Sequence, residues 1–271
     1  MIADFSAAFS ATQSDSDYTA EDSTLKARIT DPLVAYKANL AANVIGTSDV
    51  LLDGGNPNPI RQKESNLGDL VADGFLAGVN RTAVADGRPL AKVAFSNGGG
   101  IRNTIAAGDI TEKSTFDVLP FDNVLVTVPN ITPARFKELM EWGVAALPGA
   151  NGKFPQISGY KLTVDTTKPA QVQNGTTITT PGQRITSLTL DDGTKIVENG
   201  AVVAGAPNVN LATTNFTASN GDDYPFNGLP QFAAGVPYQQ SLYDFIVDDL
   251  AGHVTAAAYP VGGEGRIVIT P

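Results

Sequence analysis

Cysteine is missing from this chain of 271 residues, and histidine occurs once, at position 253. Without cysteine there is no disulfide, no thiolate nucleophile and no cysteine-ligated zinc. One histidine is too few for a typical two-metal hydrolytic centre, and the Gly-x-Ser-x-Gly turn that often accompanies a Ser-His-Asp triad is absent. We therefore interpret His253 as a surface residue or a cation at a helix end, and assign the chain no catalytic residue and no metal site.

Basic residues and long apolar runs are also scarce. The chain has 18 Lys and Arg residues and 28 Asp and Glu residues, which gives a formal net charge of −10. This charge repels a nucleic-acid backbone, so no nucleic-acid partner is expected, although a local group of arginines and backbone N–H groups can still bind a small anion. No apolar run reaches the roughly 18 residues of a membrane-spanning helix, so no membrane partner is expected either. The first residues lack the pattern of a signal peptide, and we expect the sequence to be a fragment of a longer protein.

Composition and apolar spacing predict two regions and four helices. Residues 1–25 are polar and weakly patterned, which favours a linker or N-terminal extension, and residues 26–271 are expected to form one domain. Helices are predicted where a capping residue precedes apolar residues at helical spacing; they begin at Asp31-Pro32, Ser65-Asn66, Thr132-Pro133 and about Ser241. The first is expected to carry Leu33, Tyr36, Leu40 and Val44 at helical spacing and to stop at Gly46.

Strands are predicted between these helices. The β-branched and aromatic stretches are 91–96, 124–128, 160–164, 186–190, 195–197 and 267–269. The turn Asp191-Asp192-Gly193 is expected to join two of them into a hairpin. Because hairpins and helices are mixed along the chain, the predicted class is α/β, bordering on α+β, with a layered mixed sheet and helices.

A glycine-rich segment is the densest candidate for chemistry. Asn97-Gly98-Gly99-Gly100-Ile101-Arg102 directly follows a predicted strand. Three glycines allow a sharp turn whose successive N–H groups suit an anion, and Arg102 could hold a phosphate with two hydrogen bonds. The alternative is an ordinary turn that ends a strand beside a surface arginine.

Two further clusters carry aromatic residues in predicted loops. They are Pro120-Phe121-Asp122-Asn123 and the segment Asn215–Pro225, which contains Phe216 and Asp222. Two exposed phenylalanines can hold a flat heteroaromatic ring, an asparagine amide can pair with its polar edge, and an aspartate can accept from ribose hydroxyls. The alternative is that the phenylalanines belong to the core and that Asn220-Gly221-Asp222-Asp223 is only a turn.

These three clusters, in this order, resemble the C-terminal domain of the 5'-nucleotidase family. The resemblance extends over residues 30 to 269 and includes three more segments: Glu64-Ser65-Asn66-Leu67-Gly68-Asp69-Leu70, Gly108-Asp109-Ile110 and Glu264-Gly265-Arg266-Ile267. A fold like that domain is therefore expected.

The resemblance implies substrate contacts at seven positions: Arg61, Arg102, Phe121, Asn123, Gly152, Phe216 and Asp222. Both arginines are implied to contact the phosphate, and both phenylalanines to stack on the base. Asn123 is implied to hydrogen-bond the base, Gly152 to contact its edge through the backbone, and Asp222 to bind the ribose.

The sequence departs from the family pattern in two places. The family commonly has two glycines before its aspartate and one after, whereas this chain reads Asn220-Gly221-Asp222-Asp223. A second basic residue often found upstream of the Arg61 position is replaced by Asn56-Pro57-Asn58-Pro59. The first difference could change which nucleotide is accepted or let the loop bind a cation, and the second would weaken phosphate binding.

The function implied by the resemblance is the substrate-specificity domain of a secreted bacterial phosphohydrolase, extracellular or periplasmic. Hydrolysis would belong to an N-terminal metallophosphatase domain with two divalent metal ions, which is absent here, so this fragment alone is expected to be inactive and to bind no cofactor. Its partners would be that domain and a nucleotide or nucleoside. Nucleotide sugars, dinucleotides and cyclic nucleotides are alternative ligands, and a structural or adhesion module with a decayed pocket is an alternative function.

Overall fold

The computed structural model describes residues 21–55 and 59–271. Most of the predicted N-terminal extension lies outside the described residues. So do residues 56–58, which belong to the segment that replaces the second basic residue of the family pattern. Contacts between Cα atoms divide the chain into Met1–Ala42 and Asn43–Pro271. The division falls after Ala42, whereas the sequence places a domain boundary after residue 25.

The described part of the first unit is helical. Asp22 caps α2 (Ser23–Leu25) by accepting from two backbone N–H groups, and a π-helical turn (Lys26–Thr30) leads into α3 (Asp31–Ala42). The helix predicted from Asp31 is thus present, but the expected position of its end is wrong. None of its side chains is buried, and it ends before Val44 and Gly46.

Val44 and Gly46 lie instead in β1 (Val44–Ser48), which pairs with β3 (Gly108–Thr111) and β14 (His253–Val254). Pairing with these distant strands overrides the local helical spacing. A Cβ atom at position 46 would lie 2.5 Å from the carbonyl oxygen of Gly252, so this glycine allows a close approach of two backbones and is not a helix stop.

The second unit contains five α-helices among the described residues: α4 (Asn66–Ala85), α5 (Glu112–Val118), α6 (Pro133–Gly143), α7 (Asn215–Ala218) and α8 (Tyr238–Asp244). Its remaining strands are β2 (Val93–Asn97), β4 (Val124–Ile131), β5 (Pro155–Ser158), β6 (Tyr160–Asp165), β7 (Val172–Asn174), β8 (Thr177–Thr180), β9 (Ile185–Leu190), β10 (Lys195–Glu198), β11 (Ala201–Val202), β12 (Val209–Thr214), β13 (Phe232–Pro237) and β15 (Ile267–Thr270).

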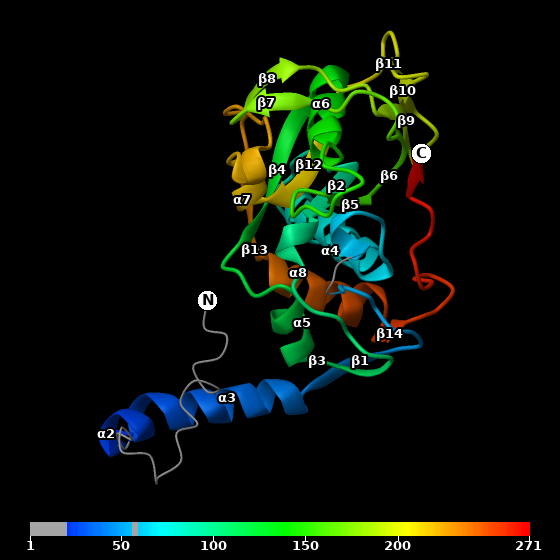
Figure 1. The fold of residues 1–271 in the computed structure, drawn as a ribbon. Coiled ribbons are helices and arrows are strands. Elements are labelled where there is room, and N and C mark those ends of the chain that lie inside the picture. Colours follow the sequence, from blue (N-terminus) through cyan, green and yellow to red (C-terminus); the bar gives the residue numbers. More distant parts are fainter. Residues whose placement is uncertain (1–20, 56–58) are drawn as a thin grey trace. The chain divides into compact units, whose positions relative to one another are not determined.

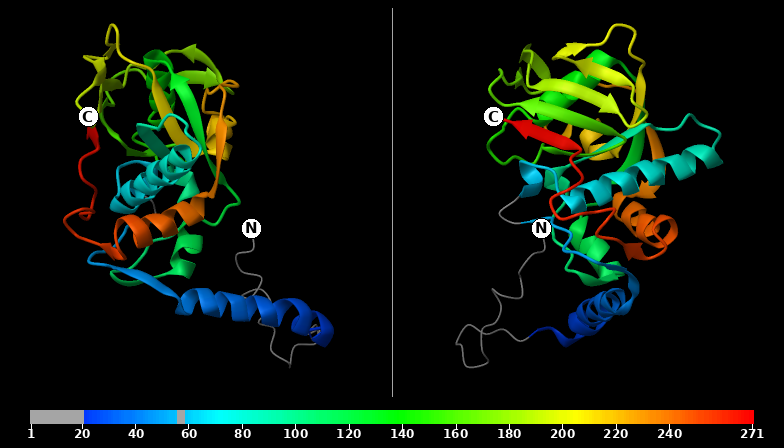
Figure 2. Two further views of the ribbon diagram at one scale, coloured as in Figure 1. Left: turned by 180° about the vertical axis from the view of Figure 1, so that it is seen from behind. Right: turned by 90° about the vertical axis from the view of Figure 1, so that its right-hand side faces the viewer.

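These strands form mixed sheets (Figures 1 and 2), which confirms the predicted fold class. The central sheet has the order β13-β4-β12-β2-β5, and the outer sheet has the order β11-β10-β9-β6-β15. A small sheet, β14-β1-β3, and the ribbon β7-β8 complete the described strands. In both sheets of five strands, parallel and antiparallel pairs occur together.

The central sheet separates two hydrophobic clusters because successive side chains of a strand point to opposite faces. On β2, Val93 and Phe95 pack into the cluster that contains Phe136 of α6 and residues of the outer sheet. Ala94 points the other way, into the cluster that contains Leu67 of α4 and Leu242 of α8. Helices α4 and α8 lie side by side on this second face (Figure 1).

The other predicted elements are present, with small shifts at their ends. Ser65 and Thr132 cap α4 and α6 through their hydroxyl groups, as the sequence indicates. The last predicted helix starts earlier, at Tyr238, and its final turn, Phe245–Asp249, is π-helical. The hairpin β9-β10 is confirmed. The elements that the sequence did not predict include α5, β5, β12 and β13.

Two distant segments of the family-like pattern meet in the structure. The Glu64 carboxylate accepts from the backbone N–H groups of Gly265 (2.8 Å) and Ile267 (2.6 Å). The Arg266 guanidinium donates to both carboxylate oxygens of Asp73 on α4, at 2.6 and 2.8 Å. These contacts hold the start of β15 against α4 and the residues just before it, although about 200 positions separate the two segments along the chain.

A buried carboxyl group lies within this network. Asp69 on α4 is completely buried, and burial raises its pKa to about 9, against the opposing effect of the nearby Arg266 charge. The neighbouring Glu64 and Asp73 carboxylates act in the same direction as burial. Asp69 is therefore uncharged in the folded protein at neutral pH.

We expect Asp69→Asn to flatten the dependence of stability on pH. In the unfolded chain an aspartate has a pKa near 3.9, so the folded state binds the extra proton between about pH 4 and pH 9. Wild-type stability should consequently fall as pH rises through this window, with a contribution of up to about 1.4 kcal/mol per pH unit from this group. Urea unfolding of both proteins from pH 5 to pH 9 measures the difference in slope.

Asp192→Asn is the matched control for this measurement. Hydrogen bonds from Thr194 and Lys92 lower the pKa of Asp192 to about 2, so its carboxylate is charged in both states over the whole range. Its replacement should leave the slope unchanged. Parallel pH profiles for wild type and Asp69→Asn would contradict the assignment.

Candidate functional site

Loops at one edge of the central sheet surround a pocket of about 380 Å³. The topology explains why they meet: β2 and β12 are parallel, so their carboxyl ends share this edge, and β4 and β5, which are antiparallel to them, begin there. The pocket is lined by Arg61, Asn97, Gly99, Gly100, Arg102, Phe121, Asn123, Gly152, Phe216 and Asp222. All seven residues proposed from the sequence are among them, and their roles remain predictions.

The glycine segment after β2 has a different role from the one expected. The N–H groups of Gly98 and Gly99 donate to the carbonyl oxygens of Phe154 and Gly152, each at 2.7 Å. They are therefore not free to bind an anion, and the predicted three-glycine anion site is wrong in this respect. A Cβ atom on Gly98 would collide with the carbonyl oxygen of Ile60, so the glycines allow close packing of loops.

Both phenylalanines of the pocket are exposed, Phe121 by 48% and Phe216 by 43%, so neither belongs to the core. The N–H group of Phe121 donates to the Tyr238 hydroxyl at 2.6 Å, which fixes the loop before β4. The Phe216 ring lies over Gly221, where a Cβ atom would come within 2.5 Å of the ring. Exposed aromatic rings held by such backbone contacts are available for stacking.

The Asp222 loop is held from outside its own segment. Asn97 Nδ2 donates to Asp222 Oδ2 at 2.7 Å, and Trp142 Nε1 donates to the Asp222 carbonyl oxygen at 2.8 Å. Asn220, Asp222 and Asp223 have positive φ angles of 70°, 53° and 59°, conformations that asparagine and aspartate tolerate better than most residues.

Neither Asn97 nor Trp142 has a role that is predicted from the sequence. Asn97 could have been found, since it is a polar residue at the end of an apolar strand and opens the glycine segment. Trp142 carries no such signal, because it reaches the loop from α6, 80 positions away along the chain.

The arginines give this pocket a local positive charge. The Arg102 guanidinium lies 5.7 Å from the centroid of the Phe121 ring, and its Nη1 donates to the Gly99 carbonyl oxygen at 3.3 Å. The backbone carbonyl of Arg61 accepts from the N–H group of Asn151 at 2.9 Å, which places Arg61 beside the loop of Gly152. Two guanidinium groups and one carboxylate therefore line the same cavity.

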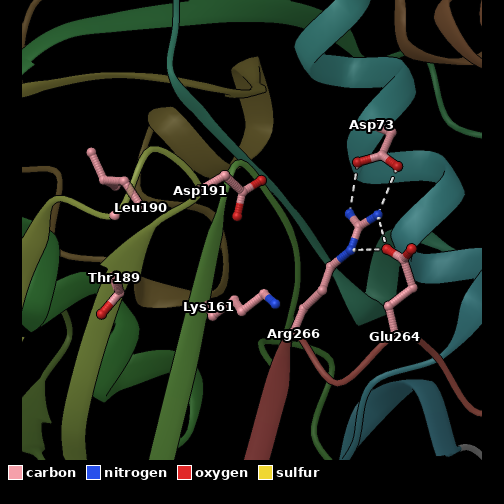
Figure 3. A pocket seen from close by; sticks show the side chains of 8 residues that line it. Asp73, Lys161, Thr189, Leu190, Asp191, Glu264 and Arg266 are labelled. Atoms are coloured by element: carbon pink, nitrogen blue, oxygen red, sulfur yellow. Dashed lines mark hydrogen bonds and ion pairs between the residues drawn. The ribbon is translucent and has the colours of Figure 1, made fainter.

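A second, larger pocket of about 540 Å³ is dominated by ion pairs (Figure 3). There the Arg266 guanidinium is held between Asp73 and Glu264 and also donates to the Ile157 carbonyl oxygen at 2.9 Å. Asp191 and Lys161 lie on the opposite side. With its arginine engaged by two carboxylates, this pocket is a poorer site for phosphate than the first.

The described residues contain no group of three or more His, Cys, Asp or Glu side chains placed to bind a metal ion. The His253 side chain is exposed, as predicted, and its Nε2 lies 2.8 Å from Asp49 Oδ1. This hydrogen bond lowers the pKa of Asp49. None of the described helices is long and apolar enough to cross a membrane.

Comparisons with known proteins agree with the resemblance. The chain is 35% identical over 180 residues to "Trifunctional nucleotide phosphoesterase protein YfkN" of Bacillus subtilis, an alignment that covers 66% of this chain and 12% of that protein. It is 30% identical over 183 residues to "Protein UshA" of Escherichia coli, covering 67% of this chain and 26% of the relative. The chain thus spans a minor part of these relatives.

Solved structures show the same architecture. The crystal structure of the 5'-nucleotidase precursor from Thermus thermophilus superposes with a TM-score of 0.68 at 26% identity, over 89% of this chain and 43% of that one. The structure of the Haemophilus influenzae NAD nucleotidase shows the same fold, with a TM-score of 0.63 at 17% identity. The superposition covers 93% of this chain and 42% of that protein's chain.

The family described as "5'-nucleotidase, C-terminal domain" matches residues 44–228, which begin with β1 and end after the Asp222 loop. The match covers the loops that form the candidate pocket, from Arg61 to Asp222. The chain therefore belongs to the 5'-nucleotidase C-terminal domain family.

Proposed function

We propose that this chain is the substrate-binding domain of a 5'-nucleotidase-type phosphohydrolase and that its pocket binds a nucleotide. One observation carries the proposal: residues suited to a base, a ribose and a phosphate, drawn from segments far apart in the sequence, line a single cavity. Their chemistry is complementary to a nucleotide in the way that aromatic, carboxylate and guanidinium groups recognise its parts.

The base would lie between Phe121 and Phe216, with Asn123 and the Gly152 backbone at its polar edge. Both rings are about half exposed, so stacking on a base would bury apolar surface that is now in water. Asp222 already accepts one hydrogen bond from Asn97, and because a carboxylate has about four acceptor positions, it retains capacity for ribose hydroxyls.

The phosphate would be held by Arg102 and Arg61. A guanidinium group matches the geometry of phosphate oxygens and keeps its charge at all physiological pH values. The position of Arg102 beside the Phe121 ring places a phosphate-binding cation next to the proposed base site.

Hydrolysis itself would take place in a metallophosphatase domain outside this chain. The chain spans 43% of the Thermus thermophilus structure and smaller shares of the two bacterial relatives, which leaves room for such a domain in a protein of this kind. Two divalent metal ions in that domain would activate the attacking water, and movement between the domains would deliver the phosphate to them. We propose that this fragment alone is inactive and that the whole protein is exported to the periplasm or the extracellular space.

Removing either aromatic ring should weaken nucleoside binding. Stacking of one base on an aromatic side chain contributes about 1–3 kcal/mol, so Phe121→Ala and Phe216→Ala should each raise the Kd for adenosine by roughly 5- to 150-fold. NMR titration of the chain with adenosine and AMP measures both affinity and the ligand-induced shifts of the two rings.

Phe232→Ala provides the control, because Phe232 is also about half exposed but lies on β13 and does not line this pocket. Its loss should leave adenosine binding unchanged. A wild-type chain whose Phe121 and Phe216 resonances do not move at millimolar adenosine or AMP would refute the proposal and favour a structural or adhesion module with a decayed pocket.

Arg102→Met should separate phosphate binding from base binding. We expect the Kd for AMP to rise at least tenfold, since a charged hydrogen bond to phosphate contributes about 1.5–3 kcal/mol, while the Kd for adenosine changes little. Arg88→Met, which removes an arginine paired with Asp86 outside this pocket, should affect neither ligand. Equal losses for AMP and adenosine in Arg102→Met would argue against a phosphate contact.

A further inference from the structure

A lysine with no assigned role follows the pocket residue Gly152. Lys153 is 8% exposed, and its ammonium group lies 3.0 Å from the centroid of the Trp142 ring. A cation over an indole face gains a favourable electrostatic interaction. Burying a charge is nevertheless costly unless groups of opposite charge lie near it.

The Asp222-Asp223 pair supplies that opposite charge. Burial lowers the pKa of Lys153 to about 8. The charge of Asp223, and to a smaller extent that of Asp222, acts in the opposite direction and favours the ammonium form. The residues are also connected through the backbone: Trp142 donates to the Asp222 carbonyl oxygen, and the Tyr224 hydroxyl donates to the Lys153 carbonyl oxygen at 2.5 Å.

The two aspartates lie in different surroundings. Asp222 lines the pocket and is held by Asn97. Asp223 does not line the pocket, and its carbonyl oxygen accepts from Gln173 Nε2 at 2.6 Å. A second negative charge one residue from the pocket would oppose the binding of an anionic ligand unless a cation offset it.

We infer that Lys153 is a positioning residue for the Asp222-Asp223 loop: its ammonium group, held on the Trp142 ring, offsets the Asp223 charge and keeps Asp222 directed into the pocket. The inference rests on the proposed nucleotide-binding function. It predicts that a phosphorylated ligand depends on Lys153 more strongly than an uncharged nucleoside does, although Lys153 does not line the pocket itself.

The test is a double-mutant cycle on the 271-residue chain, with AMP and adenosine as probes. Lys153→Met should raise the Kd for AMP about tenfold and the Kd for adenosine less. In the Asp223→Asn background the same substitution should raise the Kd for AMP less than about threefold, because the charge that Lys153 offsets is gone. Asparagine tolerates the positive φ angle at position 223.

Lys92→Met, at a surface lysine paired with Asp192, is the matched control and should leave both Kd values unchanged. Circular dichroism and thermal unfolding establish that each variant is folded, and Lys153→Gln replaces Lys153→Met if the latter does not fold. An equal loss of AMP affinity in both backgrounds would mean that Lys153 only packs against Trp142, and no loss at all would mean that it has no part in binding; either result overturns the inference. A wild-type chain that binds neither probe would instead refute the proposed function, and the inference with it.

Discussion

The parallel pairing of β2 with β12 is the constraint on which the pocket depends. Val93 and Ala94 lie beside Leu211 and Ala212 in register, so the segments that leave the carboxyl ends of these strands emerge at the same edge of the sheet. One carries Arg102 and the other carries Phe216 and Asp222. Each strand is also paired with an antiparallel neighbour that starts at this edge, and thus four loops meet although more than 100 residues separate the first from the last.

Close contacts between backbones then set the shape of the cavity. Gly98 and Gly99 donate to carbonyl groups of the loop that contains Gly152, and Gly221 lies under the ring of Phe216. A Cβ atom at position 98 would lie 2.4 Å from the carbonyl oxygen of Ile60, so a side chain there would separate segments that now touch. The glycines thus allow close packing around the pocket. A glycine-rich turn by itself suggests another role, the binding of an anion by free N–H groups.

The hydrogen-bond network around Glu64 and Arg266 lies next to the pocket residue Arg61 in the sequence. Glu64 follows Arg61 by three positions, and its contacts with the backbone of Gly265 and Ile267 fix the start of α4. The neighbouring Asp69 keeps its proton because burial disfavours its charged form. The segment that contains Arg61 is therefore followed by residues whose positions are fixed by hydrogen bonds to a distant part of the chain.

The sequence by itself determined the class of fold, the helices with strong caps such as Ser65 and Thr132, most of the strands with dense β-branched residues, and, through resemblance, the identity of the residues that line the pocket. These depend on local spacing and on motifs, both of which can be read along one chain. Strand β12, inside the central sheet, and the short strand β5, at its edge, were missed, and Val44 was misassigned because strand pairing with distant residues overrode its helical spacing.

Only the tertiary structure decided which partners hold the site. Asn97 and Trp142 donate hydrogen bonds to Asp222 from positions 125 and 80 residues away, and nothing local in the sequence relates them. The engagement of the Gly98 and Gly99 N–H groups likewise required the loop of Gly152 to be in place. The physical reason is the same in each case: a hydrogen bond or a charge interaction between residues distant in sequence depends on distances in space, and these are set by how the sheets and helices pack.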